Sequence, residues 1–341
     1  MSTKLKKSPK IWKLAKDLGI RHPNDPVSDI LSYCNNKVEK FLKDFPTCKT
    51  LSDLLDCIAG KVGTVFEEIH TDDDLKRIKS KYLKLSEKIF VNLEKDLSDD
   101  VYGITFKRTN RDIWEREYIS VIDCRSNKAL RSYYTKWHEI AHLLILTDQM
   151  RLYFRRTNYL PDKDPEEILV DVVAGTFGFY PPIVRKYPIN ELSFESIDNL
   201  RAQLCPEASQ QSSLIGFVKA WQNPCLLVYG QLALKKQEQE QLNQLNFEFS
   251  KSLKPALRAT KVTSNEAALK EGLRIFENMR IPQQSIIHRI FENGDMYGEG
   301  YENLSWWETS DGIKLPDTHI HVKTKRLGDS IYALIIPVTN N

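Results

Sequence analysis

Two histidines and a glutamate near the middle of the chain have the residue types and spacing of a metal site. Residues 137–142 read Trp-His-Glu-Ile-Ala-His, so His138 and His142 stand four positions apart and Glu139 follows the first. On a helix this spacing places both imidazoles on one face, the geometry in which two histidines bind one zinc ion. Zinc lowers the pKa of its bound water towards about 7, and Glu139 could then take the proton. The motif predicts a zinc-dependent hydrolase with Glu139 as general base.

The same two histidines could instead be ordinary residues of a buried helix. Their neighbours are strongly apolar, because Ile140, Ala141 and all of residues 143–146 are hydrophobic. Such a helix is buried, and buried imidazoles need polar partners or a metal. A pair of predicted strands also precedes the helix, as a zinc peptidase requires. We therefore favour the metal site.

A catalytic zinc site needs a third protein ligand, and three acidic residues downstream are candidates. After a predicted loop over residues 152–165, residues 166–179 form the next predicted helix, which carries Glu166, Glu167 and Asp171. Glu167 and Asp171 are four residues apart and share a face, whereas Glu166 points about 100° away. We expect Glu167 to be the ligand, with Glu166 and Asp171 as the alternatives.

Local patterns predict the elements that position these residues. Thr71, followed by three aspartates, is a strong helix start, and apolar residues at helical spacing continue to Leu93. Residues 101–107 and 117–124 alternate like two antiparallel strands. Residues 125–148 then have the period of a helix. The sequence therefore places the histidine motif on a helix that directly follows a strand pair.

These residues resemble the ImmA/IrrE-type metallopeptidases of bacteria and their mobile elements. The family pattern R-F-T-x-A-H-E-x-x-H corresponds to Tyr133–His142, YYTKWHEIAH, and E-x-x-A-N-x-F-A-A corresponds to Glu167–Gly175, EILVDVVAG. As in the family, a proline follows the second stretch, at Pro181. The resemblance covers roughly residues 51–187. Departures from the family pattern include Trp137, Val170, Asp171 and Val173, and the proline lies about one residue late.

The resemblance implies a zincin-like peptidase whose metal ligands are His138, His142 and Glu167 and whose base is Glu139. In the related gluzincin arrangement a helix with E-x-x-x-D supplies a glutamate to the metal. The aspartate does not bind the metal but contacts a ligand histidine and fixes its tautomer and orientation. Asp171 would have that second role. Members of the family cut a helix-turn-helix repressor or act beside a toxin or a phage-response partner.

The resemblance also raises two questions about partners. Residues 117–124 would be the edge strand that pairs with an extended substrate, or else an internal strand of the sheet. Residues 196–204 and 209–221 have the outline of a helix-turn-helix. The second of these helices offers few residues that read bases, with Gln210, Gln211 and Lys219 among apolar neighbours. We expect it to be a packing helix, and we expect no direct nucleic-acid binding.

Composition sets the class of protein. The chain has 341 residues, 41% of them hydrophobic, and a net charge of +3, which gives no sign of a nucleic-acid or membrane partner. No apolar run reaches the roughly 18 residues of a membrane span, and the lysine-rich start lacks the apolar core of a secretory signal. Six scattered cysteines without a C-x-x-C pair indicate reduced thiols. We expect a cytoplasmic protein that does not bind membranes.

Other chemistry-bearing residues have simpler explanations. His319 and His321 share a face of a predicted strand and could form a second metal site with His288, although solvated or core histidines are commoner. Trp306 and Trp307 fit a small β core better than a binding surface. Four tyrosines are candidates to stabilise an oxyanion, and the sequence does not choose among them: Tyr133, Tyr134, Tyr153 and Tyr159.

The predicted fold class is α+β, in four parts. They are an N-terminal helical segment over residues 1–50, a zincin-like peptidase domain over 51–187, a helical, degenerate helix-turn-helix-like segment over 188–260, and a C-terminal α+β sensor-like or docking domain over 261–341. In the last part we expect a helix over residues 264–279, a hairpin turning at Asn293-Gly294-Asp295 and another at Leu327-Gly328-Asp329.

The predicted function is a zinc endopeptidase that selectively cleaves a protein partner, a repressor or a toxin or defence-system component, in a bacterial stress or phage response. The competing hypothesis is a catalytically silent regulatory binding protein that keeps the zincin fold. An intact Glu139 favours the enzyme, because a scaffold does not need a general base.

Overall fold

The computed structural model describes residues 3–147, 153–157, 164–189, 191–235, 238 and 254–338. The chain has an α+β fold, as predicted, and divides into two compact units. Unit 1 comprises Met1–Ile183 and Asn199–Ser213, and unit 2 comprises Val184–Asp198 and Leu214–Asn341. Each unit contains one sheet covered by helices.

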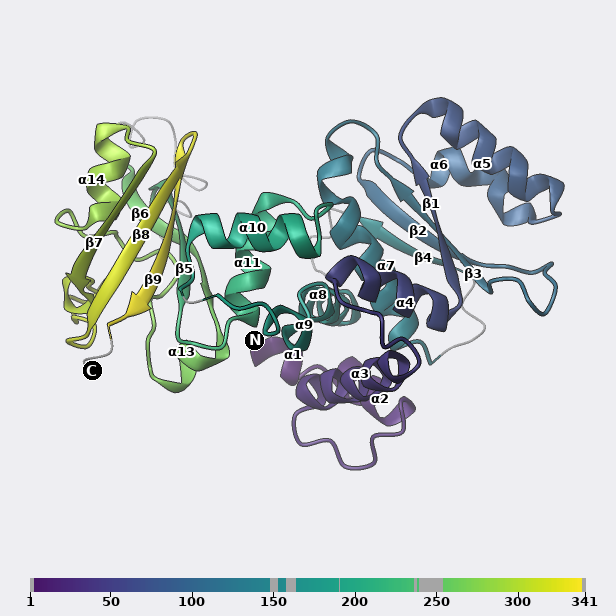
Figure 1. The fold of residues 1–341 in the computed structure, drawn as a ribbon, viewed down its shortest axis with the longest axis horizontal. Coiled ribbons are helices and arrows are strands. Elements are labelled where there is room, and N and C mark those ends of the chain that lie inside the picture. Colours follow the sequence, from purple (N-terminus) through teal and green to yellow (C-terminus); the bar gives the residue numbers. More distant parts are fainter. Residues whose placement is uncertain are drawn as a thin grey trace. The chain divides into compact units, whose positions relative to one another are not determined.

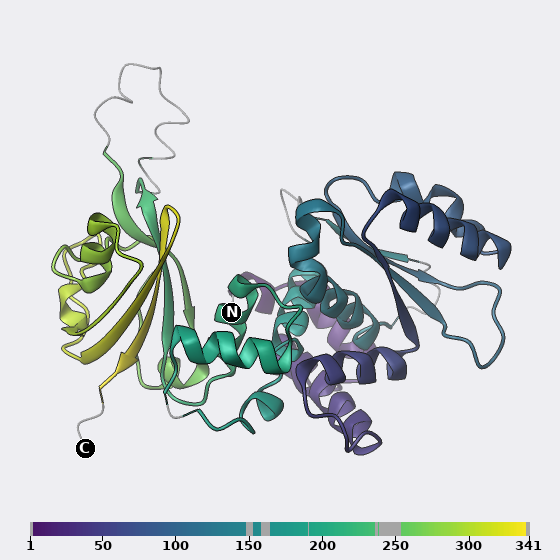
Figure 2. The ribbon, with the colours of Figure 1, turned by 45° about the horizontal axis from the view of Figure 1, so that its top comes forward.

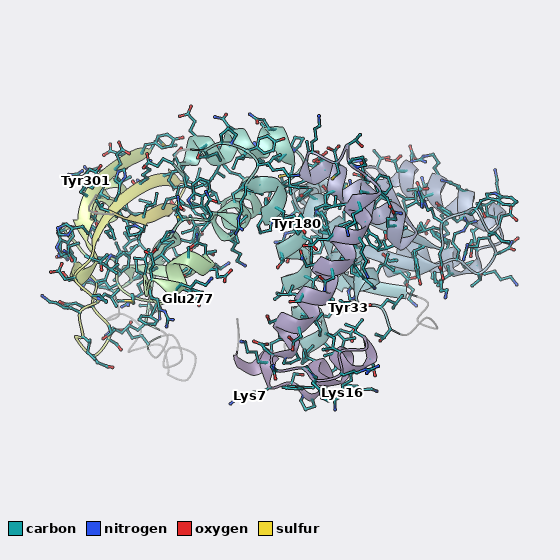
Figure 3. The ribbon with its side chains drawn as sticks, turned by 60° about the horizontal axis from the view of Figure 1, so that its bottom comes forward. Lys7, Lys16, Tyr33, Tyr180, Glu277 and Tyr301 are labelled. Carbon is teal, nitrogen blue, oxygen red and sulfur yellow. The ribbon has the colours of Figure 1, made fainter. Side chains whose placement is uncertain are left out.

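Four helices open unit 1: α1 (Thr3–Lys6), α2 (Pro9–Asp17), α3 (Pro26–Lys43) and α4 (Leu51–Val62). The first three lie within the fifty residues that the sequence predicts to be helical. Asp25 caps α3 by accepting hydrogen bonds from two backbone amides, and Thr50 caps α4 in a capping box. Ile11 and Ala15 of α2 are buried, whereas lysines such as Lys7 and Lys16 face solvent (Figure 3). The basic start of the chain is a solvated helix face.

The sheet of unit 1 has four strands in the order β1-β3-β2-β4: β1 (Thr64–Ile69), β2 (Val101–Lys107), β3 (Tyr118–Asp123) and β4 (Tyr153–Thr157). The predicted antiparallel pairing of β2 with β3 is confirmed, and β1 runs parallel to β3. Because β3 lies between β1 and β2, the internal one of the two alternatives considered for this strand holds. β4 replaces part of the loop predicted over residues 152–165 and pairs antiparallel to β2.

One face of this sheet is covered by α5 (Asp72–Lys84), the 3-10 helix η1 (Lys88–Asn92) and α6 (Leu93–Asp96) (Figure 1). The capping box at Thr71 confirms the predicted helix start. The predicted continuation to Leu93 is wrong, because the backbone turns at Ser86, whose φ is +63°. The turn folds the apolar residues of η1 and α6 back onto the sheet, where they share one core with Ile104 and Phe106.

The opposite face of the sheet is covered by α7 (Ser132–Leu144), which follows the 3-10 helix η2 (Ser126–Arg131) (Figure 1). α7 packs in turn against α8 (Pro165–Phe177), and the short α9 (Pro181–Val184) follows. Asp164 caps α8 with Pro165 at its first position, a strong start signal. Both helices occur where the sequence predicts them, although α7 is shorter than the predicted residues 125–148.

The stretch Pro165–Val184 is long and apolar enough to cross a membrane by length and composition, contrary to the expectation that no segment is. More than half of its apolar window is buried inside the structure, and α8 packs against α7. Burial of this kind marks the core helix of a globular unit.

Unit 2 is built on a five-stranded antiparallel sheet (Figure 2). The strand order is β6-β5-β9-β8-β7, with β5 (Leu226–Ala233), β6 (Ala256–Ser264), β7 (Tyr297–Asn303), β8 (His319–Leu327) and β9 (Ser330–Pro337). Its helical elements are α10 (Phe194–Leu204), α11 (Gln210–Ala220), α13 (Glu266–Lys270), α14 (Ile286–Asn293) and the 3-10 helix η4 (Leu304–Trp306). The unit boundaries pass within α10 and α11. Trp307 and aliphatic side chains from the sheet and α14 form one core.

Several expectations for this half of the chain are wrong. The segment 188–260 is not helical throughout, because it contains β5 and the first half of β6, and a boundary at residue 260 would divide β6. The predicted helix over 264–279 is reduced to α13. The residues read as the first strand of a hairpin at Asn293-Gly294 form α14 instead, and Gly294 ends that helix with a φ of +80°. The hairpin from β8 to β9 is confirmed.

Candidate metal centre

The histidine motif lies on the buried face of α7. His138 and His142 are one turn apart, their ring centroids are 4.9 Å from each other, and both side chains are buried. The helix presses this face against α8 and against strands β2 and β3. The sequence thus places two imidazoles inside unit 1, where only polar partners or a cation can offset their desolvation.

Glu167 on α8 faces both imidazoles. One carboxylate oxygen, Oε2, lies 3.3 Å from His138 Nε2, and Oε1 lies 3.4 Å from His142 Nε2. Each of the three residues offers one ligand atom to a group in which all ligand atoms lie within 4.8 Å of one another. Neighbouring ligand atoms of a tetrahedral zinc site with bonds of about 2.0–2.1 Å are about 3.3–3.4 Å apart. Each of the two nitrogen-to-oxygen distances has the length of one edge of such a tetrahedron, and each involves a different oxygen of Glu167.

Asp171 approaches His138 from the other side. Its Oδ1 lies 3.1 Å from His138 Nδ1, so this ring nitrogen carries the proton and donates to the carboxylate. The other ring nitrogen, Nε2, lies 3.3 Å from a Glu167 oxygen, a contact that is favourable when a cation, a proton on Nε2 or a metal ion, lies between the two atoms. The donor set fits a divalent metal such as zinc.

The charge state of Glu167 is consistent with this assignment. Burial raises the pKa of its carboxyl group, but hydrogen bonds from His138 and His142 outweigh that effect and hold the pKa well below its usual range. Glu167 is therefore an ionised carboxylate, the form that binds metals.

The other two acidic candidates have different partners. Asp171 contacts Nδ1 of His138 and not the nitrogen that faces Glu167, and its backbone oxygen accepts a hydrogen bond from the Tyr134 hydroxyl at 2.8 Å. The Glu166 carboxylate lies 3.4 Å from Lys10 Nζ on α2. Of the three acids considered from sequence, Glu167 is the one whose carboxylate the structure brings to both histidines.

Glu139 is buried between α7 and strand β2. Its Oε2 accepts a hydrogen bond of 2.7 Å from the hydroxyl of Thr105. A Cβ added to Gly103 would lie 3.1 Å from Glu139 Oε1 and 2.6 Å from a Thr135 methyl carbon, so only glycine lets the strand pass this close to the helix. Sequence reasoning missed Thr105 and Gly103. A glycine inside a strand is a known sign of close backbone approach and could have pointed to Gly103.

The tyrosine candidates for oxyanion stabilisation are only partly described. The Tyr133 hydroxyl is buried and donates to the backbone oxygen of Gly178 at 2.6 Å, which is a packing role. The Tyr134 hydroxyl donates to the backbone of Asp171. Tyr159 and the side chain of Tyr153 lie outside the described residues.

Trp137, which departs from the family pattern, has a structural role. It is fully buried, and a Cβ added to Gly178 would lie 3.3 Å from its indole ring. The large side chain therefore fills the space that a glycine leaves at the end of α8.

The histidines of unit 2 do not form a comparable cluster. His321 lies near Glu191 and Glu299, at 3.4 and 3.6 Å, and His288 lies near Glu292 at 3.3 Å. Within the described residues, two groups of at least three potential ligands come together, and neither includes a histidine of unit 2.

The second such group consists of Glu68, His70 and Cys124. Its Glu68 carboxylate is already balanced by Lys136 Nζ at 2.7 Å. Burial and, to a smaller extent, the neighbouring Glu68 raise the pKa of Cys124 to about 12, so the thiol keeps its proton. Because metals bind the thiolate, this group is a poorer site than the first. All six cysteines lie in the described part of the chain, and none forms a disulfide bond.

No model of a known protein family matches the chain, and no curated protein matches it. The resemblance of residues 133–142 and 167–175 to the ImmA/IrrE pattern therefore stays a prediction from the sequence. The geometry around His138, His142 and Glu167 carries the functional argument.

Proposed function

We propose that the chain is a zinc-dependent endopeptidase with a zincin-like catalytic domain in unit 1. The observation that carries this proposal is the convergence of two imidazoles and one carboxylate from α7 and α8, with all ligand atoms within 4.8 Å. A buried carboxylate, Glu139, follows the first histidine on the same helix. Structural histidines need no such combination of a third acidic ligand and an adjacent base.

In this proposal the metal is held by Nε2 of His138, Nε2 of His142 and the carboxylate of Glu167. When bound, zinc lowers the pKa of a coordinated water and polarises a peptide carbonyl. Asp171 keeps the proton of His138 on Nδ1 and so presents the lone pair of Nε2 to the metal. Glu139 accepts the proton of the attacking water and returns it to the leaving amine nitrogen.

The family resemblance extends the proposal to a substrate class. ImmA/IrrE-type peptidases act on single protein partners, so we infer that this chain cuts a repressor or a toxin or defence-system component in a bacterial stress or phage response. A cytoplasmic location agrees with six cysteines that form no disulfide bond. The net charge of +3 agrees with a protein substrate and not a nucleic acid.

The decisive experiment compares the wild-type chain with Glu139→Gln. Both are expressed at equal levels beside the products of the neighbouring genes, and new protein N-termini are identified by mass spectrometry. A terminus that requires Glu139 identifies the partner and its cleavage site. Zinc in the purified wild-type protein without any such terminus would favour the silent regulatory protein instead.

Glu166→Gln provides the matched control, because it removes a carboxylate next to Glu167 that lies beside Lys10 and not beside the histidines. This variant should keep both zinc and cleavage. If it loses zinc as Glu167→Gln does, the ligand assignment on α8 is wrong.

A further inference from the structure

Three hydroxyl groups on three neighbouring strands form a line that ends at Glu139. Thr64 on β1 lies 2.8 Å from the Ser120 hydroxyl on β3, and Ser120 lies 2.7 Å from the Thr105 hydroxyl on β2. Thr105 lies 2.7 Å from Glu139 Oε2. All four residues are buried. The line therefore crosses the sheet and joins β1 to α7 without leaving the interior.

Strand pairing explains why the hydroxyls meet. Thr105 and Ser120 are direct partners in the antiparallel ladder of β2 and β3. In the parallel ladder, Ser120 stands opposite Phe66, so Thr64, two residues before Phe66, is on the same face. Side chains alternate along β2, so Thr105 faces α7 while Ile104 and Phe106 join the apolar core beneath α5. One face of the sheet is apolar and the other carries the hydroxyls.

The direction of the hydrogen bonds follows from the carboxylate. The Thr105 hydroxyl donates its single proton to Glu139 Oε2. The Thr105 oxygen must then accept from Ser120, and Ser120 must accept from Thr64. Each hydrogen bond polarises the next, which strengthens the last one in a buried chain. The hydrogen bond that Thr105 donates to Glu139 is thus strengthened by the two hydrogen bonds that lead to it.

This arrangement restricts the carboxylate on two sides. Thr105 holds Oε2, and the backbone at Gly103 lies against Oε1, where a Cβ would be 3.1 Å away. Rotation of the carboxylate would break the bond from Thr105. Its plane is therefore set by the sheet and not only by the rotamer of Glu139 on α7.

We propose that Thr105 is a positioning residue for Glu139, and that Ser120 and Thr64 support it. The catalytic consequence rests on the proposed peptidase function. Thr105 contacts the base itself and acts through its orientation.

Thr105→Val tests the proposal, because valine keeps the shape of threonine and removes the hydroxyl. We expect kcat for cleavage of the identified partner to fall about 10- to 100-fold, as for a misplaced catalytic group, with KM and zinc content unchanged. Thr105→Ser should recover most of the loss. Ser120→Ala should have a smaller effect than Thr105→Val, because Thr105 can still donate. Thr176→Val, which removes a hydroxyl that donates to Val172 O on α8, is the matched control and should leave kcat unchanged.

A second measurement does not depend on activity. Thermal unfolding of metal-free wild type, Thr105→Val, Glu139→Ala and the double variant forms a double-mutant cycle. The loss of Tm caused by Thr105→Val should be clearly smaller when residue 139 is alanine. Additive shifts in Tm, an unchanged kcat in Thr105→Val, or equal losses in Thr105→Val and Thr105→Ser would each overturn the proposal. If wild type cleaves nothing, the proposed function fails, while the cycle still decides whether Thr105 holds Glu139.

Discussion

Two histidine pairs in this chain look similar in sequence and differ in their surroundings. His138 and His142 are four apart on a helix, buried, and share the carboxylate of Glu167. His319 and His321 are two apart on strand β8. His321 stacks on the ring of Tyr301, a residue that is exposed (Figure 3). It also lies near two glutamates, both more than half exposed.

Both spacings place two imidazoles on one face. The difference lies in the element opposite them. α8 offers α7 a single carboxylate that reaches both rings, whereas the partners of His321 come from separate segments and face solvent. A histidine pair therefore predicts a metal site only when another buried element supplies a common ligand.

Removing either histidine of the first pair should give the largest effect. We expect purified wild type to contain about one zinc per chain, and His138→Ala and His142→Ala to contain none, because two of three protein ligands cannot hold a catalytic zinc tightly. His319→Ala and His321→Ala are the controls and should keep full zinc. Metal analysis by mass spectrometry distinguishes the two pairs. If the His138→Ala/His142→Ala double variant retained zinc, the assignment of the zinc site to unit 1 would be wrong.

Replacing the base should separate chemistry from metal binding. Glu139→Gln keeps nearly the same shape, so zinc content and partner affinity should persist, while single-turnover cleavage should fall by at least about 10²–10⁴-fold. The variant should trap an uncut complex. Unchanged cleavage with zinc present would exclude Glu139 as the base, and loss of zinc would make it a structural residue.

Loss of the contact between Asp171 and His138 should have a moderate effect on metal affinity. Asp171→Ala removes the acceptor of His138 Nδ1, and losses of this kind weaken metal affinity by about 10- to 100-fold. Competition with a chelator measures the change. A complete loss equal to that of Glu167→Ala would make Asp171 a ligand itself.

Replacing an acidic residue near His321, in the second pair, should have the smallest effect, and that effect is on stability. A hydrogen bond from Lys323 holds the pKa of Glu191 below its ordinary value, against a smaller opposing effect of burial. A lowered pKa stabilises the folded state above the unfolded pKa of about 4.3, and this contribution is lost as pH falls through the folded value. Glu191 is more than half exposed, and ion pairs on the surface contribute about 0.2–1 kcal/mol. Glu191→Gln should therefore lower the free energy of unfolding at pH 7 by no more than this amount. Chemical unfolding of wild type and variant at pH 7 and pH 3 measures the difference in their free energies of unfolding. This difference should shrink at pH 3, and a larger difference at pH 3 than at pH 7 would contradict the prediction.

Sequence patterns located the elements that depend on local signals. The capping box at Thr71, the strands β2 and β3, and the helices α7 and α8 follow from caps, alternation and helical spacing within a few residues. The proximity of Glu167 to the histidine pair could also be anticipated, because it needs only two helices to face each other.

Features that depend on distant pairing could not be predicted. β5 pairs with β9, so residue 226 meets residue 335, and no local pattern encodes that register. Asn293-Gly294 satisfies the rule for a hairpin turn and equally the rule for a helix end, and the apolar spacing of Ile286, Ile287 and Ile290 decides for the helix. Thr105 is an ordinary strand residue until the ladder places Ser120 beside it.

The interrupted course of the chain through its two units has a consequence for synthesis on the ribosome. Unit 1 needs residues up to Ser213, yet Val184–Asp198, which belongs to unit 2, emerges before that last piece. Strand β9, the central strand of the second sheet, ends at Pro337. Synthesis proceeds at about 5–20 residues per second. On the order of 10 s therefore pass between the synthesis of residues 184–198 and that of β9, the last strand of unit 2. During that interval unit 1 can be complete while unit 2 is still unfolded.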